Sequence, residues 1–156
     1  MFKINIVAVG RIKEDYYKKA FEEYVKRLGR FALIKVYETE ETTFSKEKGM
    51  EKTALLREEE KILPLIKGHT FALAIEGRGL SSEEFSDKIK KLKEKGVSEL
   101  TFIVGGSYGL SETVKKRADE LISFSEMTFP HTLFRVMLAE QIYRALMIDS
   151  GSSYHK

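Results

Sequence analysis

Cysteine is absent from this chain of 156 residues, and histidine occurs only three times. The lack of cysteine excludes disulfides, a thiolate nucleophile and cysteine-ligated zinc or iron–sulfur sites, and it agrees with a reducing cytoplasm. Three histidines are too few for a histidine-rich metal cage. We therefore expect no metal site.

Long apolar runs are also missing. No stretch reaches the roughly 18–20 apolar residues that a membrane span needs, and residues 1–9 lack the leading charge and cleavage site of a signal peptide. Internal repeats and Gly/Ser linkers are absent as well, and the length suits one domain. We expect a single cytoplasmic domain over residues 1–156 with no membrane partner.

Positive charge is in only slight excess, with a net charge of +3 and a pI near 8.9. Dedicated nucleic-acid modules are usually more basic and carry a clear Lys/Arg stripe. The lysine-rich residues 88–95 read as a solvated helix face. The balance permits an RNA partner, whose recognition would then depend on RNA shape or on a large assembly.

The remaining pattern alternates β-rich runs with helical periodicity, which indicates an α/β fold with a mainly parallel sheet and helices on both faces. Ser81 and Glu84 form a capping box at a helix start, and Ser111 is a further N-cap. The polar residues 38–50 are expected to form a mobile loop. The expected strands are 2–9, 33–37, 70–75, 100–104 and 121–124, and the expected helices include 16–28, 83–95 and 132–149.

The last expected helix, 132–149, is apolar on nearly all sides, so it must be buried on most of them. One short domain rarely covers such a helix alone. We therefore expect a homodimer, the commonest symmetric assembly. Arg135 and Arg144 are charged islands in this helix, and each needs a carboxylate across the dimer or the substrate as partner.

A glycine-rich run, Val-Gly-Gly-Ser-Tyr-Gly at residues 104–109, follows the fourth expected strand. Glycines let main-chain amides approach a ligand, although a tight turn without a ligand explains them equally. Leu110-Ser111 stands where a P-loop needs Lys-Ser/Thr, which excludes that motif. The dinucleotide fingerprint fails at Val104, although Glu126 lies at a suitable distance, so an NAD-dependent oxidoreductase is a weak alternative.

Two further segments belong with this run, namely the strand end Glu-Gly-Arg-Gly at 76–79 and residues 124–131. Ligands of open parallel sheets sit beyond the carboxyl ends of the strands, where all three loops would meet. Three such loops can hold an adenosine through main-chain groups. S-adenosylmethionine carries no phosphate, so it would need no lysine clamp. The alternative is three ordinary connections.

The chain ends in Tyr154-His155-Lys156. A tyrosine can stack on a base, a histidine can take a proton near neutral pH, and a lysine can meet phosphate. The alternative is a plain, frayed tail. The other two histidines have simple interpretations, since His131 can help to cap the last helix and His69 can lie in an exposed turn.

Several motifs together resemble those of the RlmH family, the 23S ribosomal RNA pseudouridine N3-methyltransferases of the SPOUT class. The likeness covers essentially the whole chain, including its terminus. The motifs that carry it are Ile-Val-Ala-Val-Gly at 6–10, Leu-Ala-Ile-Glu-Gly at 73–77, the run 103–110, the segment 123–131, the helix with Arg135-Val136 and residues 139–145, and the ending 154–156.

The resemblance implies an α/β domain whose C-terminal part forms a deep trefoil knot, a rare exception to the rule against knots. It implies S-adenosylmethionine as methyl donor and a pseudouridine of 23S rRNA, on the assembled ribosome, as substrate. The modest charge would then reflect docking on the ribosome. By matching position, the donor-binding residues are Leu73, Gly105, Phe124, Ser125, Glu126, Met127, Thr128 and Phe129.

The resemblance also suggests roles for residues of the tail and the last helix. His155 is expected to assist proton removal from N3 or to orient the base, and Tyr154 to stack on it. Arg135 is expected to stabilise developing negative charge, either in its own subunit or from the other. Lys156 stands where the family often has arginine, so bidentate phosphate contact is lost. The alternative function is a non-enzymatic ribosome-associated binding factor.

Overall fold

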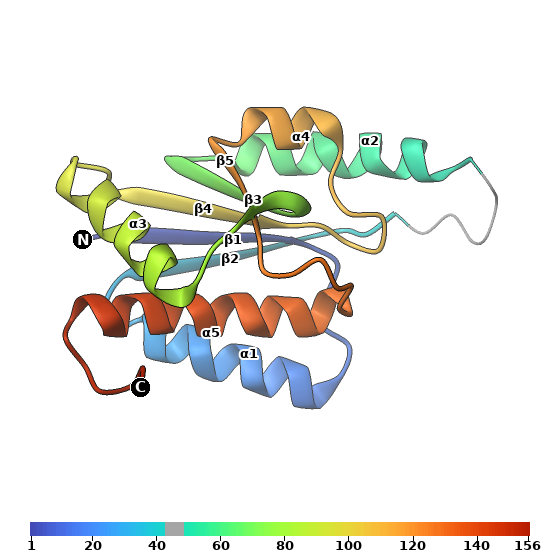
Figure 1. The fold of residues 1–156 in the computed structure, drawn as a ribbon. Coiled ribbons are helices and arrows are strands. Elements are labelled where there is room, and N and C mark those ends of the chain that lie inside the picture. The colour runs from blue at the N-terminus through green and yellow to red at the C-terminus, as the bar shows by residue number, and fades with distance from the viewer. Residues whose placement is uncertain (43–48) are drawn as a thin grey trace.

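The computed structural model describes residues 1–42 and 49–156. Its centre is a sheet of five parallel strands in the order β2-β1-β4-β3-β5 (Figure 1). The mainly parallel α/β fold predicted from the sequence is thereby confirmed. The strands are β1 (Lys3–Val9), β2 (Leu33–Thr39), β3 (His69–Gly79), β4 (Glu99–Val104) and β5 (Glu120–Ser123).

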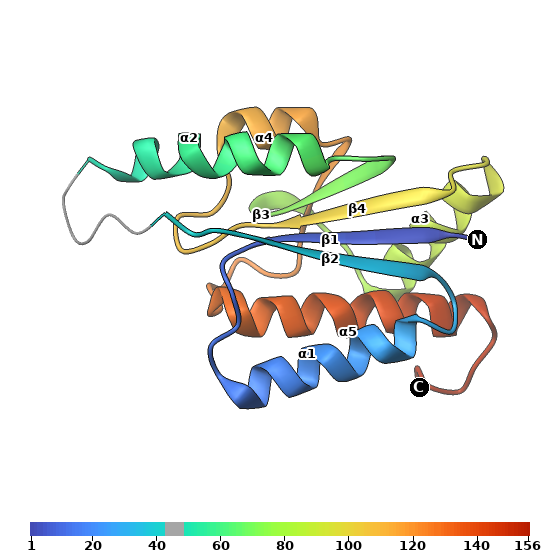
Figure 2. The same cartoon turned by 180° about the vertical axis from the view of Figure 1, so that it is seen from behind.

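Helices cover both faces of this sheet, as expected (Figures 1 and 2). One face carries α1 (Asp15–Leu28), α3 (Ser82–Glu94) and α5 (His131–Asp149), with α5 between the other two. The opposite face carries α2 (Glu51–Ile62) with its short 3₁₀ extension η1 (Leu63–Leu65), and α4 (Glu112–Arg117). In the described part of the chain, none of these helices has the length and apolar character needed to cross a lipid bilayer.

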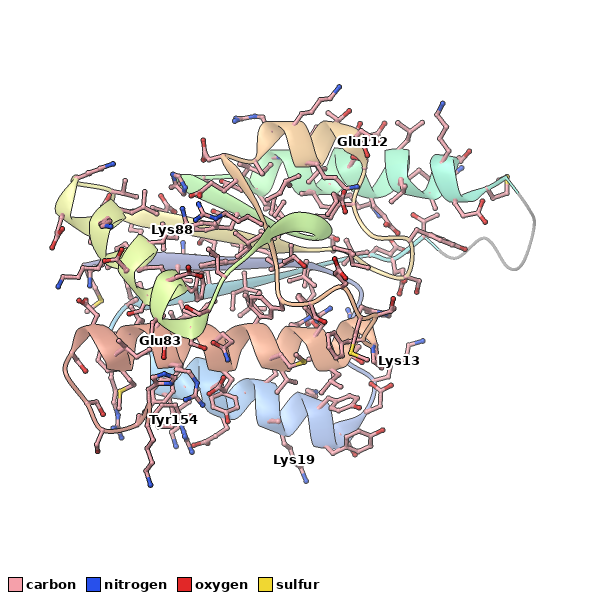
Figure 3. The ribbon with its side chains drawn as sticks, in the orientation of Figure 1. Lys13, Lys19, Glu83, Lys88, Glu112 and Tyr154 are labelled. Atoms are coloured by element: carbon pink, nitrogen blue, oxygen red, sulfur yellow. The ribbon has the colours of Figure 1, made fainter. Side chains whose placement is uncertain are left out.

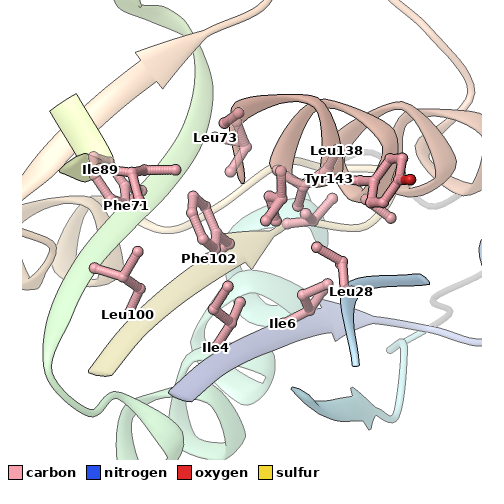
Figure 4. Close-up of a cluster of buried hydrophobic side chains, with 14 of the residues drawn as sticks. Ile4, Ile6, Leu28, Phe71, Leu73, Ile89, Leu100, Phe102, Leu138 and Tyr143 are labelled. Atoms are coloured by element: carbon pink, nitrogen blue, oxygen red, sulfur yellow. The ribbon is translucent and has the colours of Figure 1, made fainter. Parts of the chain in front are cut away.

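The core is formed by apolar side chains on both faces of β1 and β4, a pattern that is typical of parallel sheets. On the α5 face, Ile4 and Ile6 of β1 pair in register with Leu100 and Phe102 of β4 (Figure 4). Phe71 of β3 stacks on Phe102 with ring centroids 5.1 Å apart. Burying each such side chain contributes roughly 1.5–3 kcal/mol, so this layer fixes the strand register.

The local signals at helix starts are confirmed. Ser81 accepts a hydrogen bond from the amide of Glu84 at 3.1 Å, and the Glu84 carboxylate accepts one from the amide of Ser81 at 2.8 Å. Ser111 accepts from the amide of Val114 at 3.2 Å at the start of α4. These caps satisfy amides that the first helical turn leaves without partners.

Two expected strand ends are wrong. β3 does not stop at Ile75, because Leu73 and Arg78 both pair with Ile122 while the residues between them leave the ladder. Glycine at 77 makes this possible, since a Cβ there would lie 2.7 Å from the backbone of Ile122. β2 continues to Thr39, opposite Val9, so the expected polar loop starts later. The rest of that loop prediction falls on residues 43–48, outside the described residues.

Helix α5 is covered by its own chain to a greater extent than the sequence argument allowed. No residue from His131 to Ile148 is exposed, because α1, α3 and the sheet pack against it. Intramolecular burial therefore accounts for most of its apolar surface. Val136 and Met137 remain half-buried and line a groove toward α3.

Candidate functional site

Three strand ends meet around a cavity of about 310 Å³ at the carboxyl edge of the sheet. The walls come from the end of β3, from the glycine loop after β4 and from the segment after β5. A cavity of this size suits a small organic ligand, at the place where open parallel sheets bind ligands. The predicted donor-binding residues that line it are Leu73, Gly105, Phe124, Ser125, Met127, Thr128 and Phe129. Glu126, the eighth, is exposed beside the cavity and is not a lining residue.

The glycine loop is compact. Gly109 donates a backbone hydrogen bond to Gly106 at 3.1 Å, and a Cβ on Gly105 would collide with the carbonyl of Gly109. Glycine at 105 is therefore required by the turn itself, whether or not a ligand binds. The same turn exposes main chain on the cavity wall. The tight turn and the ligand-binding loop that the glycines suggested are therefore compatible with one geometry.

Aromatic rings form the inner side of the cavity. The ring centroids of Phe124 and Phe134 are 5.1 Å apart, and those of Phe129 and Phe134 are 6.4 Å apart. Flat apolar walls with nearby main-chain groups suit a planar heterocycle. One ion pair lies among the lining residues, with Lys115 Nζ 2.6 Å from Glu76 Oε1.

Glu41 holds the glycine loop from outside the cavity. Its Oε1 accepts hydrogen bonds from the amide of Ser107 at 3.1 Å and from the Ser107 hydroxyl at 2.8 Å. Its other oxygen lies 3.9 Å from Nε2 of His131 at the start of α5. No sequence signal pointed to Glu41, because this residue stands in a polar stretch with no motif around it.

Arg135 lies inside the protein and is fully buried. Its guanidinium donates to Glu38 at 2.7 Å and to the carbonyls of Val9 and Gly10 at 3.2 and 3.1 Å. Burial lowers the pKa of Arg135, and Glu38 opposes that effect. The arginine thus ties α5 to the ends of β1 and β2 and is not a lining residue of the cavity. Its partner is a carboxylate of the same chain, so the expected partner across a dimer or in the substrate is wrong.

The C-terminal tail packs against α5 through Tyr154 (Figure 3). Tyr154 packs edge-to-face on Tyr143 at 4.9 Å, lies under the guanidinium of Arg144, and donates a hydrogen bond to Glu140 at 3.2 Å. Burial and the nearby Glu140 carboxylate raise the pKa of Tyr154 to about 12. The tail therefore contacts α5 through Tyr154, which keeps its proton at neutral pH.

His155 lies between two charged side chains. Its Nδ1 is 3.0 Å from a guanidinium nitrogen of Arg144, and its Nε2 is 2.6 Å from Glu83 Oε1. Arg144 can only donate, so Nδ1 accepts and Nε2–H donates to Glu83. This contact lowers the pKa of Glu83. Arg144 also pairs with Glu140 one turn away, so its partner, too, lies in the same chain.

One protomer does not bring the tail to the cavity. The cavity includes His131 and Phe134 at the start of α5, whereas Tyr154 contacts Glu140 in the middle of the helix and His155 contacts Arg144 further on. These two contacts lie about 9 and 15 Å beyond Phe134 along the helix axis. Within one protomer, most of the predicted donor-binding residues therefore lie around the cavity, whereas the predicted catalytic residues are not among its lining residues.

A second hollow adjoins the cavity. This groove has a volume of about 480 Å³ and lies between α3, α5 and the end of β5. Ser123 and Phe124 line both the groove and the cavity. The apolar side chains in its wall include Leu80, Phe85, Ile122, Val136 and Met137.

Comparison with known proteins relates this geometry to a family. A family model described as "Predicted SPOUT methyltransferase" matches residues 2–155. A Streptococcus thermophilus protein named "Ribosomal RNA large subunit methyltransferase H" is 46% identical over 158 residues, which cover 99% of each chain. A Lactobacillus helveticus protein with the same name is 47% identical over 162 residues, covering 98% of this chain and 99% of its own.

Solved structures with very different sequences share the fold. A probable methylase family protein from Haemophilus influenzae has a TM-score of 0.54 and 7% identity, over 99% of this chain and 70% of its own. A putative methylase family protein from Neisseria gonorrhoeae has a TM-score of 0.55 and 9% identity, over 99% and 86%. The fold alone does not identify the family, whereas the family model and the near full-length relatives do. The chain belongs to the SPOUT methyltransferase family, alongside the large subunit methyltransferase H proteins.

Proposed function

We propose that this protein transfers a methyl group from S-adenosylmethionine to N3 of a pseudouridine in 23S rRNA, on the assembled ribosome and in the cytoplasm. It acts as a homodimer of one SPOUT domain, residues 1–156, whose C-terminal part is knotted. The observation that carries this proposal is the cavity built from three strand ends in a chain 46–47% identical to proteins named rRNA large subunit methyltransferases.

The residues of the cavity fit the donor. Phe124, Phe129 and Phe134 offer flat apolar surfaces for the adenine ring, and the main chain of Gly105 lies at the wall. The bound donor would supply a methyl group already activated on a sulfonium. The work left to the protein is to hold the acceptor nitrogen in line and to help remove its proton.

The tail offers residues for that work. Tyr154 keeps its proton at neutral pH, so it serves as a ring for stacking and as a hydrogen-bond donor. His155 offers an imidazole that can receive the N3 proton or orient the base, and Arg144 with Glu83 holds its ring in place. Arg135 supports the site indirectly, because it fixes the start of α5 next to the cavity.

A second copy of the chain accounts for the distance between tail and cavity. The apolar groove shares Ser123 and Phe124 with the cavity, so a subunit packed on the groove would lie next to the donor. Symmetric packing of this kind can bring the tail of one subunit to the cavity of the other.

The test uses ribosomes that lack the modification, incubated with the protein and S-adenosylmethionine, followed by mass mapping of the rRNA. We expect one added methyl group on a pseudouridine of 23S rRNA. His155→Ala is expected to reduce this transfer strongly while donor binding, measured by calorimetry, stays near the wild-type value. Lys95→Ala, at an exposed position after α3, is the control. Ribosome binding without donor binding would indicate a non-enzymatic factor and would contradict the proposal.

A further inference from the structure

The cavity contains one pair of opposite charges among its described lining residues. Lys115 on α4 and Glu76 after the buried part of β3 meet at 2.6 Å, and the lysine side chain is 17% exposed while the glutamate is 54% exposed. Among the other lining residues, His131 and Tyr108 also carry ionisable side chains, and the rest are apolar, glycine or hydroxyl residues. The charges are therefore concentrated on one side of the cavity.

The chain makes an irregular path to place Glu76 there. Leu73 and Arg78 pair with the same residue of β5, so residues 74–77 leave the ladder, and the first three of them line the cavity. A regular strand would have kept Glu76 in the sheet. The irregularity thus supplies one charge of the pair, and α4 supplies the other.

Both groups are ionised near neutral pH. The hydrogen bond to Glu76 raises the pKa of Lys115, and Lys115 lowers the pKa of Glu76. Lys115 has a second contact, 3.3 Å from Glu112, whose side chain is 79% exposed and does not line the cavity. Glu112 is the first residue of α4 (Figure 3). Partly exposed pairs of this kind contribute little to stability, so fold stability does not require the Lys115–Glu76 pair.

We propose that Lys115 and Glu76 bind the α-amino acid end of the methyl donor, with Lys115 contacting its carboxylate and Glu76 its ammonium. This inference rests on the proposed function. The adenosine end of the donor is uncharged and fits the aromatic and main-chain walls, whereas the other end is a zwitterion. Lys115 Nζ has three N–H donors and Glu76 has a second carboxylate oxygen, so each can contact the ligand while the pair persists.

The test compares two ligands that differ only at this end. S-adenosylhomocysteine carries the amino acid group, and 5′-methylthioadenosine keeps the adenosine and the sulfur without it. In calorimetry, Lys115→Met is expected to weaken S-adenosylhomocysteine binding about tenfold, which corresponds to one charged hydrogen bond. Binding of 5′-methylthioadenosine is expected to stay unchanged. Glu76→Gln is expected to show the same selective loss.

Two control variants separate this role from general effects of charge. Lys116→Met removes the neighbouring exposed lysine, and Glu112→Gln removes the partner of Lys115 that lies outside the cavity. Both should bind the two ligands as the wild type does. Equal weakening of both ligands by Lys115→Met, or no weakening of either, would overturn the inference while leaving the proposed function intact. A wild-type protein that binds neither ligand would overturn both.

Discussion

At the scale of single residues, Glu58 on α2 is a carboxylate in an unfavourable place. Its exposed fraction is 2%. One oxygen accepts a hydrogen bond from the amide of Thr42 at 3.1 Å, and the other has no partner among the described residues. Burial raises the pKa of Glu58 above its usual value of 4.5. Burial of this carboxyl group therefore penalises its charged form.

This raised pKa predicts how stability depends on pH. The folded state binds the Glu58 proton more tightly than the unfolded state does, so the benefit is complete below pH 4.5 and is lost as pH rises through the folded pKa. Glu58 therefore contributes less stability at pH 7 than at pH 4. Glu58→Gln is expected to raise the melting temperature at pH 7 and to lose most of this advantage at pH 4. Glu60→Gln, at an exposed position, is the control. If the melting temperatures of Glu58→Gln and the wild type differ by the same amount at pH 4 and pH 7, the prediction is contradicted.

Arg135 and Arg144 illustrate which ion pairs a sequence pattern can predict and which it cannot. A cation in an apolar helix needs a partner, and both arginines have one. The Glu140–Arg144 pair could have been found from helical spacing alone. The Glu38–Arg135 pair could not, because it joins residues 97 positions apart that meet only when α5 packs below the ends of β1 and β2.

At the scale of elements, the glycine loop after β4 depends on a contact from another segment. Glu41 accepts two hydrogen bonds from Ser107, so the loop is fixed to the chain that follows β2. Glu41→Ala is expected to speed hydrogen exchange of the Ser107 amide about tenfold, because hydrogen bonds to a charged acceptor contribute about 1.5–3 kcal/mol. Donor affinity should fall as the loop loosens.

The neighbouring Glu40 provides a matched control for this loop. Its side chain is 83% exposed and pairs with Lys61 instead of Ser107. Glu40→Ala should leave both the Ser107 exchange rate and the donor affinity at wild-type values. If Glu41→Ala leaves the exchange rate unchanged as well, Glu41 does not position the loop.

Local signals predicted the starts of elements better than their ends. The caps at Ser81 and Ser111 depend on side chains within three residues, so they are readable from the sequence. The continuation of β3 past Gly77 depends on β5, which lies far along the chain and returns to pair with it. Glycines that indicated the end of a strand instead allow close approach of two strands.

At the scale of the whole molecule, the cavity was predictable and the position of the tail was not. Carboxyl ends of parallel strands share an edge of the sheet, so three glycine-rich or polar strand ends had to lie near one another. No comparable rule predicts where the C-terminal tail lies. Its place beside Glu83 and Glu140 depends on the length of α5 and on the turn after it.

This separation makes a test of the dimer possible. In a homodimer that joins the tail of one subunit to the cavity of the other, each active site draws on both chains. Gly105→Ala, which forces a collision with Gly109, should disable the cavity, and His155→Ala should disable the tail. Each variant alone is expected to be inactive. Co-expressed with different tags and purified for both, the mixed dimer has one site with both parts intact.

The expected yield follows from counting. The purified mixed dimer should show about half the wild-type activity, and an unselected equal mixture about a quarter, because half of its dimers are mixed. If cavity and tail of the same subunit worked together, each mixed dimer would hold two sites with one disabled part, and no activity would return. Restored methyl transfer therefore requires that the tail cross between subunits, since no site within a single chain of the mixed dimer is complete.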